Sequence, residues 1–99
     1  FARQIEALGN KGDVAFGITT SGRSENVILG LKKSKKCGMQ TICFCGKDKE
    51  LLEKITDTII SIPAVNTSRI QEMHITIGQM LCNAIEKGLK LSEFVKSEK

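Results

Sequence analysis

Three short apolar runs that lack a helical period lie between segments that have one, and this alternation leaves few architectures open to the chain. The runs are 14-VAFGI-18, 40-QTICFC-45 and 57-DTIISI-62, and their composition is typical of strands. Amphipathic segments at 25–36 and 49–55 connect them as helices. Strands joined by right-handed helical crossovers form a parallel sheet that is covered on both faces. The sequence therefore predicts an α/β fold, a three-layer sandwich around a parallel sheet in which the run 14–18 is a buried strand.

Both ends of the sequence suggest that further protein surrounds these residues. The first residues, 1-FARQIEALG-9, begin inside an amphipathic helix, so we expect a fragment of a longer domain. The longest predicted helix, 67–91, is apolar over most of its circumference, which is typical of a buried helix. Three strands in a chain of 99 residues cannot cover it alone. We expect the rest of the domain or a second subunit to do so.

A cluster of hydroxyl side chains follows the first predicted strand, in 17-GITTSGRSEN-26. Ligands of open parallel sheets bind at the carboxyl ends of the strands, where the next helix offers free N–H groups and a partial positive charge. Gly22 lets the backbone approach a ligand closely, and Arg23 adds charge. A single hydroxyl residue here would merely cap the helix. Four of them in six positions predict a phosphate site, formed by Thr19, Thr20, Ser21 and Ser24.

Other phosphate and nucleophile motifs are absent from the sequence. It has no G-x-x-x-x-G-K-[ST], no G-x-G-x-x-G and no G-x-S-x-G. This argues against an NTPase, a dinucleotide enzyme and a hydrolase with a nucleophile elbow.

The net charge of +4 does not indicate a nucleic-acid partner. The excess cations lie in 32-KKSKK-36, where a predicted helix ends and where cations interact favourably with the helix dipole. Aromatic residues, which would support nucleic-acid binding, do not alternate with these lysines. A solvated helix end is the favoured interpretation.

The cysteines and the hydropathy predict a cytoplasmic protein. Cys37, Cys43, Cys45 and Cys82 lack the C-x2-C pairs of a structural zinc site, so we interpret them as buried thiols in a reducing compartment. No apolar run approaches the ~20 residues that a membrane span requires, so we expect no membrane segment.

Three segments carry a family resemblance: 12-GDVAFGITTSGRSENV-27, 41-TICFCGKD-48 and 69-RIQEMHI-75. They resemble the sugar isomerase (SIS) domain of phosphoheptose isomerases over about residues 1–90, with 91–99 as a C-terminal tail. The resemblance implies a flavodoxin-like SIS fold whose N-terminal part is missing here. It also implies a cytoplasmic homotetramer that interconverts sedoheptulose 7-phosphate and D-glycero-D-manno-heptose 7-phosphate, with the four hydroxyl residues holding the substrate phosphate.

The resemblance further concerns two glutamines of the last helix. In the family a glutamate and a histidine move the protons of the aldose–ketose reaction, and these residues can bind zinc together with a further histidine and a glutamine. The family's glutamine matches Gln71, as a substrate or metal ligand, whereas the position of the catalytic histidine is held by Gln79. A carboxamide does not exchange a proton near neutral pH and is a weaker metal ligand than imidazole. Catalysis at Gln79 and a zinc cofactor on Gln71 and Gln79 are therefore open, while the phosphate site needs no metal.

Two further residues of this segment bear on the function. His74 belongs to the R-I-Q-E-x-H pattern, and as a lone histidine on an apolar helix it is predicted to be a hydrogen-bonded structural residue rather than a replacement acid or base. Ser68 stands where isomerases of the family often have aspartate.

Three functions therefore compete. Isomerisation is the leading hypothesis. A catalytically silent module that binds a sugar phosphate or a protein partner, similar to the DnaA initiator-associating protein, is the alternative. A transcription regulator would require a helix-turn-helix, which these residues do not show.

Overall fold

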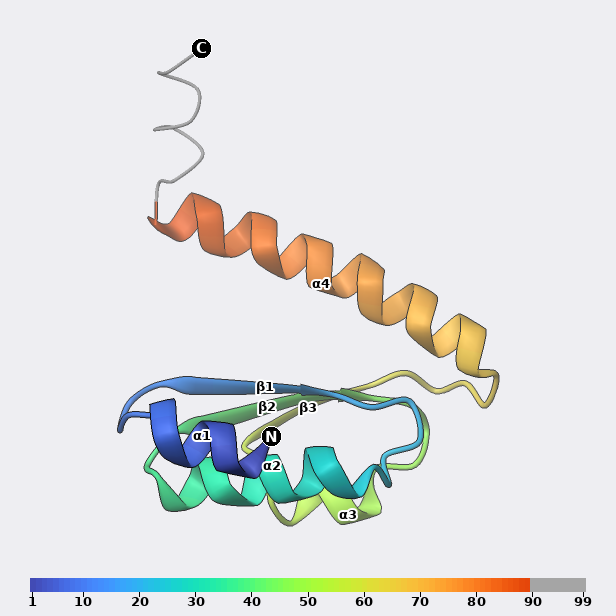
Figure 1. Ribbon diagram of the computed structural model, residues 1–99. Coiled ribbons are helices and arrows are strands. Elements are labelled where there is room, and N and C mark those ends of the chain that lie inside the picture. Colours follow the sequence, from blue (N-terminus) through green and yellow to red (C-terminus); the bar gives the residue numbers. More distant parts are fainter. Residues whose placement is uncertain (90–99) are drawn as a thin grey trace.

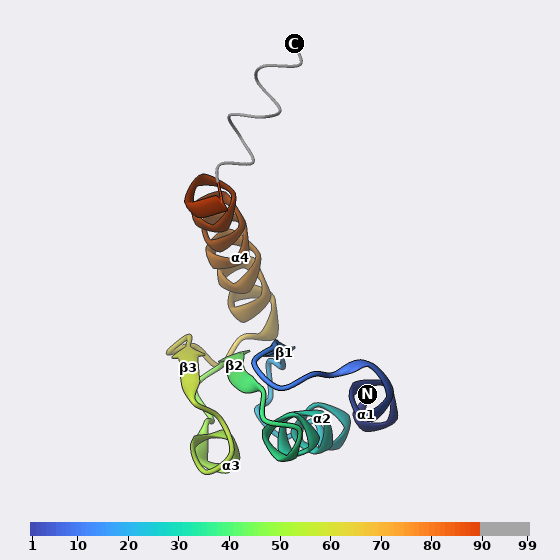
Figure 2. The same cartoon turned by 90° about the vertical axis from the view of Figure 1, so that its left-hand side faces the viewer.

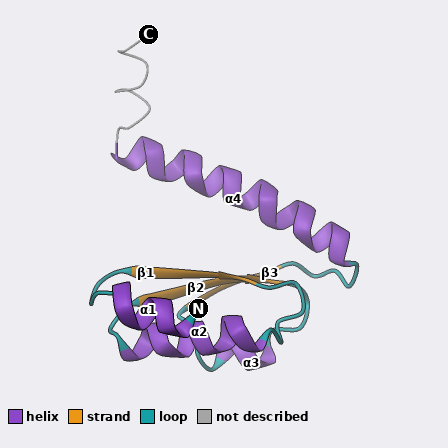
Figure 3. Cartoon of the chain, viewed as in Figure 1, coloured by secondary structure: helices purple, strands orange, loops and turns teal. Residues whose placement is uncertain are grey.

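The computed structural model describes residues 1–89, in which helices and strands alternate as predicted (Figure 3). The elements are α1 (Ala2–Leu8), β1 (Val14–Ile18), α2 (Glu25–Lys36), β2 (Gln40–Cys45), α3 (Glu50–Glu53), β3 (Thr58–Ser61) and α4 (Thr67–Leu89). The segments predicted at 49–55 and 57–62 are shortened to α3 and β3. Residues 90 and 91, predicted to end the last helix, lie outside the described residues, as does the predicted tail 91–99.

The strands form one parallel sheet in the order β1-β2-β3. Val14 pairs with Gln40, and Ile42 pairs with Thr58. Consecutive strands are neighbours, so each connection crosses one face of the sheet through a helix. Helices α1, α2 and α3 lie on one face and α4 lies on the other (Figure 2). The predicted three-layer α/β architecture is confirmed.

The central strand β2 holds the core because it is covered on both faces. Its Cys43 and Cys45 side chains are fully buried in a cluster with Leu31 of α2 and Leu52 of α3. Phe44 points to the other face, is also fully buried, and meets the ring of Phe16 edge-on at a centroid distance of 4.6 Å. A strand that is buried on both sides needs apolar residues in succession, which explains the run that ends at Cys45.

The prediction that residues 14–18 are buried is wrong for the described chain. β1 lies at one edge of the sheet, and Val14, Phe16 and Ile18 are 56%, 40% and 56% exposed. Its alternate residues face α2, where a side-chain carbon on Gly17 would lie 3.1 Å from Val27. One face of β1 is therefore packed and the other is open.

Helix α4 is largely uncovered, as expected from its apolar circumference. It begins beside the carboxyl ends of the strands and rises away from the sheet toward its C-terminal end (Figure 1). Only Ile70 and His74 are buried along its length. Cys82 is exposed on it. The prediction of four buried thiols is therefore correct for Cys43 and Cys45 and wrong for Cys82, and Cys37 is half-buried. Among residues 1–89, no helix combines the length and the apolar character of a membrane span.

Polar contacts connect α2, β2 and the start of β3 at the edge of the sheet opposite the carboxyl ends of the strands. Lysines occupy the last turn of α2, as predicted. One of them, Lys35, lies 3.2 Å from Asp57. Asp57 also accepts hydrogen bonds from the backbone N–H (2.9 Å) and the hydroxyl (3.2 Å) of Thr41. The bond from the Thr41 backbone N–H, and then Lys35, lower the pKa of Asp57 below its ordinary value of 3.8.

This lowered pKa makes Asp57 a contributor to acid sensitivity. A carboxyl whose pKa is depressed by folding adds stability above its ordinary pKa, and this stability is lost as the pH falls through the folded value. We expect urea unfolding of the intact protein to show a steeper loss of stability below about pH 4 than the Asp57→Asn variant shows. Glu53→Gln is the control, because Glu53 has only an exposed ion pair with Lys49. Identical acid profiles for wild type and Asp57→Asn would contradict the assignment.

Candidate phosphate site and the cavity beside helix α4

The hydroxyl loop, residues 19–24, is held in its conformation by hydrogen bonds to its own side chains. The Thr19 backbone N–H donates to the Phe44 carbonyl (3.0 Å), which continues the pairing of β1 and β2. Within the loop, the Thr19 hydroxyl accepts a bond from the Gly22 N–H (3.3 Å) and the Ser21 hydroxyl accepts one from the Arg23 N–H (3.1 Å). The loop is thus a tight turn that leads into α2.

Ser24 does not act as the helix cap that its position suggests. It occupies the N-cap of α2, yet its side chain makes no hydrogen bond to the helix. Ser24 therefore keeps its hydroxyl free, and the first-turn N–H groups of α2 lack the usual side-chain acceptor. Both kinds of donor suit an anion at this position.

Gly22 is required because the neighbouring loop touches it. Its φ is +70°, a conformation that favours glycine, and a side-chain carbon there would collide with the Asp48 carbonyl oxygen. Arg23 donates from Nε to the Asp48 carboxylate at 2.7 Å. The hydroxyl loop and the turn 46–48 are therefore in close contact. The Arg23 charge, predicted to interact with the ligand, is paired with Asp48 in this structure.

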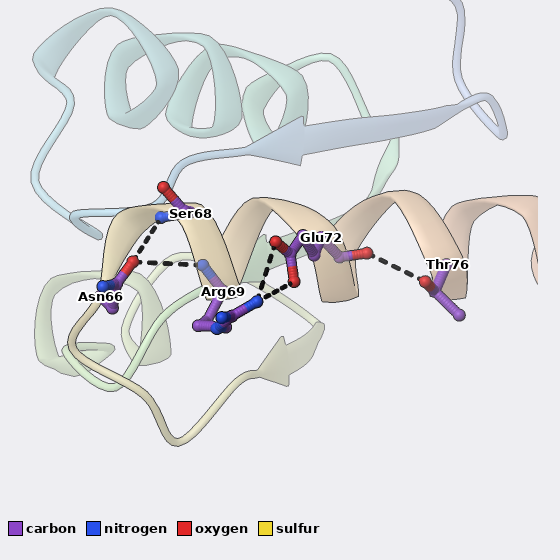
Figure 4. Close-up of polar contacts among 5 residues, drawn as sticks. All are labelled: Asn66, Ser68, Arg69, Glu72 and Thr76. Carbon is purple, nitrogen blue, oxygen red and sulfur yellow. Dashed lines mark hydrogen bonds and ion pairs between the residues drawn. The ribbon is translucent and has the colours of Figure 1, made fainter.

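Helix α4 begins with a capped first turn (Figure 4). The Asn66 carboxamide oxygen accepts bonds from the N–H groups of Ser68 (2.9 Å) and Arg69 (3.4 Å). Arg69 donates to both carboxylate oxygens of Glu72, at 3.0 and 2.8 Å. The charged residues of the R-I-Q-E-x-H segment thus pair with each other in solvent. Ser68 supplies only a backbone donor to the cap.

His74 faces the sheet and is 5% exposed. Its Nε2 lies 2.9 Å from the carbonyl oxygen of Cys45, and because a carbonyl can only accept, Nε2 carries the proton and donates it. The imidazole also lies against Phe44, at a centroid distance of 5.5 Å. The predicted hydrogen bond of His74 is confirmed. Its Nδ1 is buried without a partner among residues 1–89.

A cavity of about 960 Å³ lies between the strand ends and α4 and collects the predicted site residues. Its polar lining consists of the four hydroxyl residues together with Gln71, His74 and Gln79. The remaining lining is mostly apolar, with Phe16, Phe44 and Ile75 among its members. An apolar cavity of this size with a few converging polar groups is typical of a small-molecule site.

Sequence reasoning missed two residues that contact the hydroxyl loop. Asp48 holds Arg23, and Gly46 lies so close to the hydroxyl loop that a side-chain carbon would be 2.7 Å from the Thr20 carbonyl oxygen. Both belong to the turn 46-GKD-48 after the second strand. The carboxyl ends of neighbouring parallel strands meet at one edge, and that rule could have identified them.

The described residues do not fit a zinc ion by themselves. Among residues 1–89 no three His, Cys, Asp or Glu side chains are grouped as a metal site would require. Gln71 and Gln79 supply neutral carboxamides, whereas zinc prefers imidazole, thiolate and carboxylate. Burial raises the pKa of Cys43 to about 12, which keeps that thiol protonated and unsuited to metal binding.

The interlocked loops predict different effects of substituting two glycines. Gly22→Ala should lower the free energy of unfolding of the intact protein by more than the ~1–2 kcal/mol that the left-handed conformation costs a non-glycine residue. The additional loss arises because the new side chain also displaces the Asp48 carbonyl. Gly12→Ala is the matched control: its φ is +93°, but no atom lies within 4 Å of the added carbon. Urea unfolding gives the stabilities, and calorimetric titration with inorganic phosphate should show weakened binding for Gly22→Ala alone. Equal losses in both variants would contradict the role of the loop contact.

Comparisons with known proteins agree with this geometry. A family model described as the SIS domain matches residues 2–87. The chain is 51% identical over 87 residues to a phosphoheptose isomerase of Aquifex aeolicus and 49% identical over 87 residues to one of a Nitratiruptor species, covering 88% of this chain and 46% of each relative. It therefore spans about half the length of the curated relatives it matches.

Two solved structures show the same arrangement of elements. A phosphoheptose isomerase from Francisella tularensis matches with a TM-score of 0.84 and 34% identity, over 88% of this chain and 49% of that one. A phosphoheptose isomerase from Neisseria gonorrhoeae matches with a TM-score of 0.81 and 39% identity, over 86% of this chain and 49% of that one. Taken with the family model that covers residues 2–87, these matches show that the chain belongs to the SIS domain family.

Proposed function

We propose that this chain forms the sugar-phosphate-binding part of a phosphoheptose isomerase, which interconverts sedoheptulose 7-phosphate and D-glycero-D-manno-heptose 7-phosphate. The observation that carries the proposal is the shared cavity, which is lined by the four hydroxyl residues and by Gln71 and Gln79 of α4. Similar proteins that bear this name, one of them 51% identical over 87 residues, support the choice of substrate. A phosphorylated sugar is thus the proposed ligand.

The hydroxyl loop would hold the phosphate through neutral donors. Each hydrogen bond to a charged group contributes roughly 1.5–3 kcal/mol, so several of them bind a phosphate without a metal. The N-terminal end of α2 adds a partial positive charge. Ser21 is exposed and Ser24 is half-buried, so both hydroxyls can reach a ligand in the cavity.

Gln71 and Gln79 would orient the oxygens of the sugar, but they cannot carry out proton transfer. An aldose–ketose isomerisation moves a proton between adjacent carbons and requires a group that exchanges protons near neutral pH. The carboxamide of Gln79 does not do so. We therefore infer that another group of the complete site moves the proton while Gln79 holds an oxygen. The same residue is the observation that favours the alternative, a silent sugar-phosphate-binding or protein-interaction module.

We further propose an oligomer, a homotetramer as the family resemblance implies, in the cytoplasm. Ile75, Met80 and Leu89 of α4 are 65–67% exposed, and large apolar residues on one long helix favour a covering subunit or segment. The four cysteines of residues 1–89 are free, which suits a reducing compartment.

An NMR time course of sedoheptulose 7-phosphate with the intact protein tests the proposed reaction. We expect resonances of the heptose 7-phosphate to grow at the expense of those of the ketose, and zinc added in a parallel sample tests the metal. Saturable binding without conversion would replace isomerisation by the silent module. Absence of binding would reject both.

The phosphate assignment predicts a selective loss of affinity. Ser21→Ala and Ser24→Ala should each weaken binding of the phosphorylated sugar about 10- to 100-fold, because each removes a donor to a charged group. Binding of the unphosphorylated sugar should change little. Ser68→Ala is the control, since Ser68 lies at the start of α4 and does not line the cavity. Equal losses for both sugars would reject the phosphate cradle.

The residue at position 79 predicts a gain of activity. Gln79→His should create or raise isomerisation, because imidazole supplies the proton exchange that the carboxamide lacks. Gln79→Asn, which keeps a carboxamide, is the control and should show no gain. The NMR time course measures all three proteins, and an unchanged rate in Gln79→His would count against this account of position 79.

A further inference from the structure

The carbonyl oxygen of Cys45 connects three segments at the end of β2. It accepts a bond from the Ile62 backbone N–H (3.0 Å), just after β3, and a second from His74 Nε2 (2.9 Å) on α4. A carbonyl oxygen has two lone pairs, so its capacity is filled. The His74 bond therefore joins α4 directly to the backbone of the central strand.

Helix α4 has little else to fix its orientation. Ile70 and His74 are its only buried residues. Ile70 packs against Gly46, where a side-chain carbon would lie 2.7 Å from Ile70 Cδ1, but an apolar contact is not directional. The hydrogen bond of His74 is directional, because the bond weakens steeply when donor and acceptor are misaligned. Among residues 1–89, rotation of α4 about its own axis is thus limited mainly by His74.

Such a rotation would move both glutamines of the cavity. At about 100° per residue, Gln71 and Gln79 lie about 80° apart on the helix and to one side of His74. A side-chain tip about 5–6 Å from the helix axis moves about 2 Å when the helix turns by about 20°. The hydroxyl loop would not follow, since it is held by β2 and Asp48.

We propose that His74 is a positioning residue of this site: its bond to the Cys45 carbonyl aligns Gln71 and Gln79 with the phosphate held by the hydroxyl loop. The proposal deepens the proposed function and rests on it for the identity of the ligand. Neither ring nitrogen of His74 is available to bind the sugar, because its Nε2 is occupied and its Nδ1 is buried. It acts through the two glutamines.

A matched pair of carboxamide substitutions tests this role. His74→Gln places an amide donor near the position of Nε2 and should keep the bond, whereas His74→Asn is one methylene too short to reach Cys45. In the intact protein we would titrate the wild type and both variants with inorganic phosphate and with sedoheptulose 7-phosphate. The affinity for inorganic phosphate should stay constant in all three. The preference for the sugar phosphate over inorganic phosphate should fall about tenfold in His74→Asn, because the neutral hydrogen bonds from Gln71 and Gln79 to the sugar are lost. The preference should be restored in His74→Gln.

A merely structural histidine would behave differently. It would lower both affinities together, or affect both variants alike, and either result overturns the proposal. If even the wild type does not bind sedoheptulose 7-phosphate in preference to inorganic phosphate, the proposed function fails. If the wild type shows this preference and His74→Asn retains it, only the role of His74 is overturned.

A second measurement does not depend on the variants being folded. Long-range ¹H–¹⁵N correlation of the wild-type imidazole, assigned by specific labelling, should show the proton on Nε2. A proton on Nδ1 alone would remove the bond to Cys45 and overturn the proposal. Where turnover is measurable, kcat should fall about 10- to 100-fold in His74→Asn with the phosphate affinity kept, as expected for misplaced groups.

Discussion

The carboxyl end of the central strand β2 positions the hydroxyl loop, the end of β3 and helix α4. Three successive carbonyls there accept hydrogen bonds from three different parts of the chain. Phe44 accepts from the start of the hydroxyl loop, Cys45 from the segment after β3 and from α4, and Gly46 from the hydroxyl of Ser61 at 2.6 Å. Because β2 is buried on both faces, these acceptors are rigidly placed and shielded from water, which makes each bond directional and costly to leave unmade.

The proposed phosphate site would bind an anion without a free cation from the hydroxyl loop itself. Arg23, the nearest cation in the loop, is paired with Asp48, and the loop offers hydroxyls and backbone N–H groups instead. This pair is largely exposed, so it contributes little stability of its own. Its effect is geometric, since it holds the turn 46–48 against Gly22 of the hydroxyl loop.

The apolar surfaces that remain open belong to the same cavity and to the same helix. Phe16 and Ile18 of β1 and Ile75 of α4 are exposed, and all three line the cavity beside the hydroxyl loop. The hydrophobic effect favours covering them, with a ligand or with further protein. If further protein completes the walls of the site, it could also supply the proton-transfer group. The proposed phosphate loop is then compatible with a carboxamide at position 79.

The sequence by itself determined the order and type of the elements, the position of the hydroxyl loop and the family. These features depend on local periodicity, on turn residues and on motifs, all of which are contiguous in the chain. Position 79 was identified through the family resemblance of the last helix. The sequence did not reveal that β1 is open on one face or that Cys82 is exposed, because burial depends on which segments pack against an element.

Only the tertiary structure decided which groups meet. Asp48 lies 25 residues from Arg23, and Cys45 lies 29 residues from His74, so neither contact leaves a trace in local pattern. The same limit applies to the partner of a buried polar atom. An imidazole on an apolar helix indicates a hydrogen bond, but only folding brings one particular carbonyl to it. Spacing along the chain specifies helices and loops, whereas the site is specified by the edge of the sheet where their ends converge.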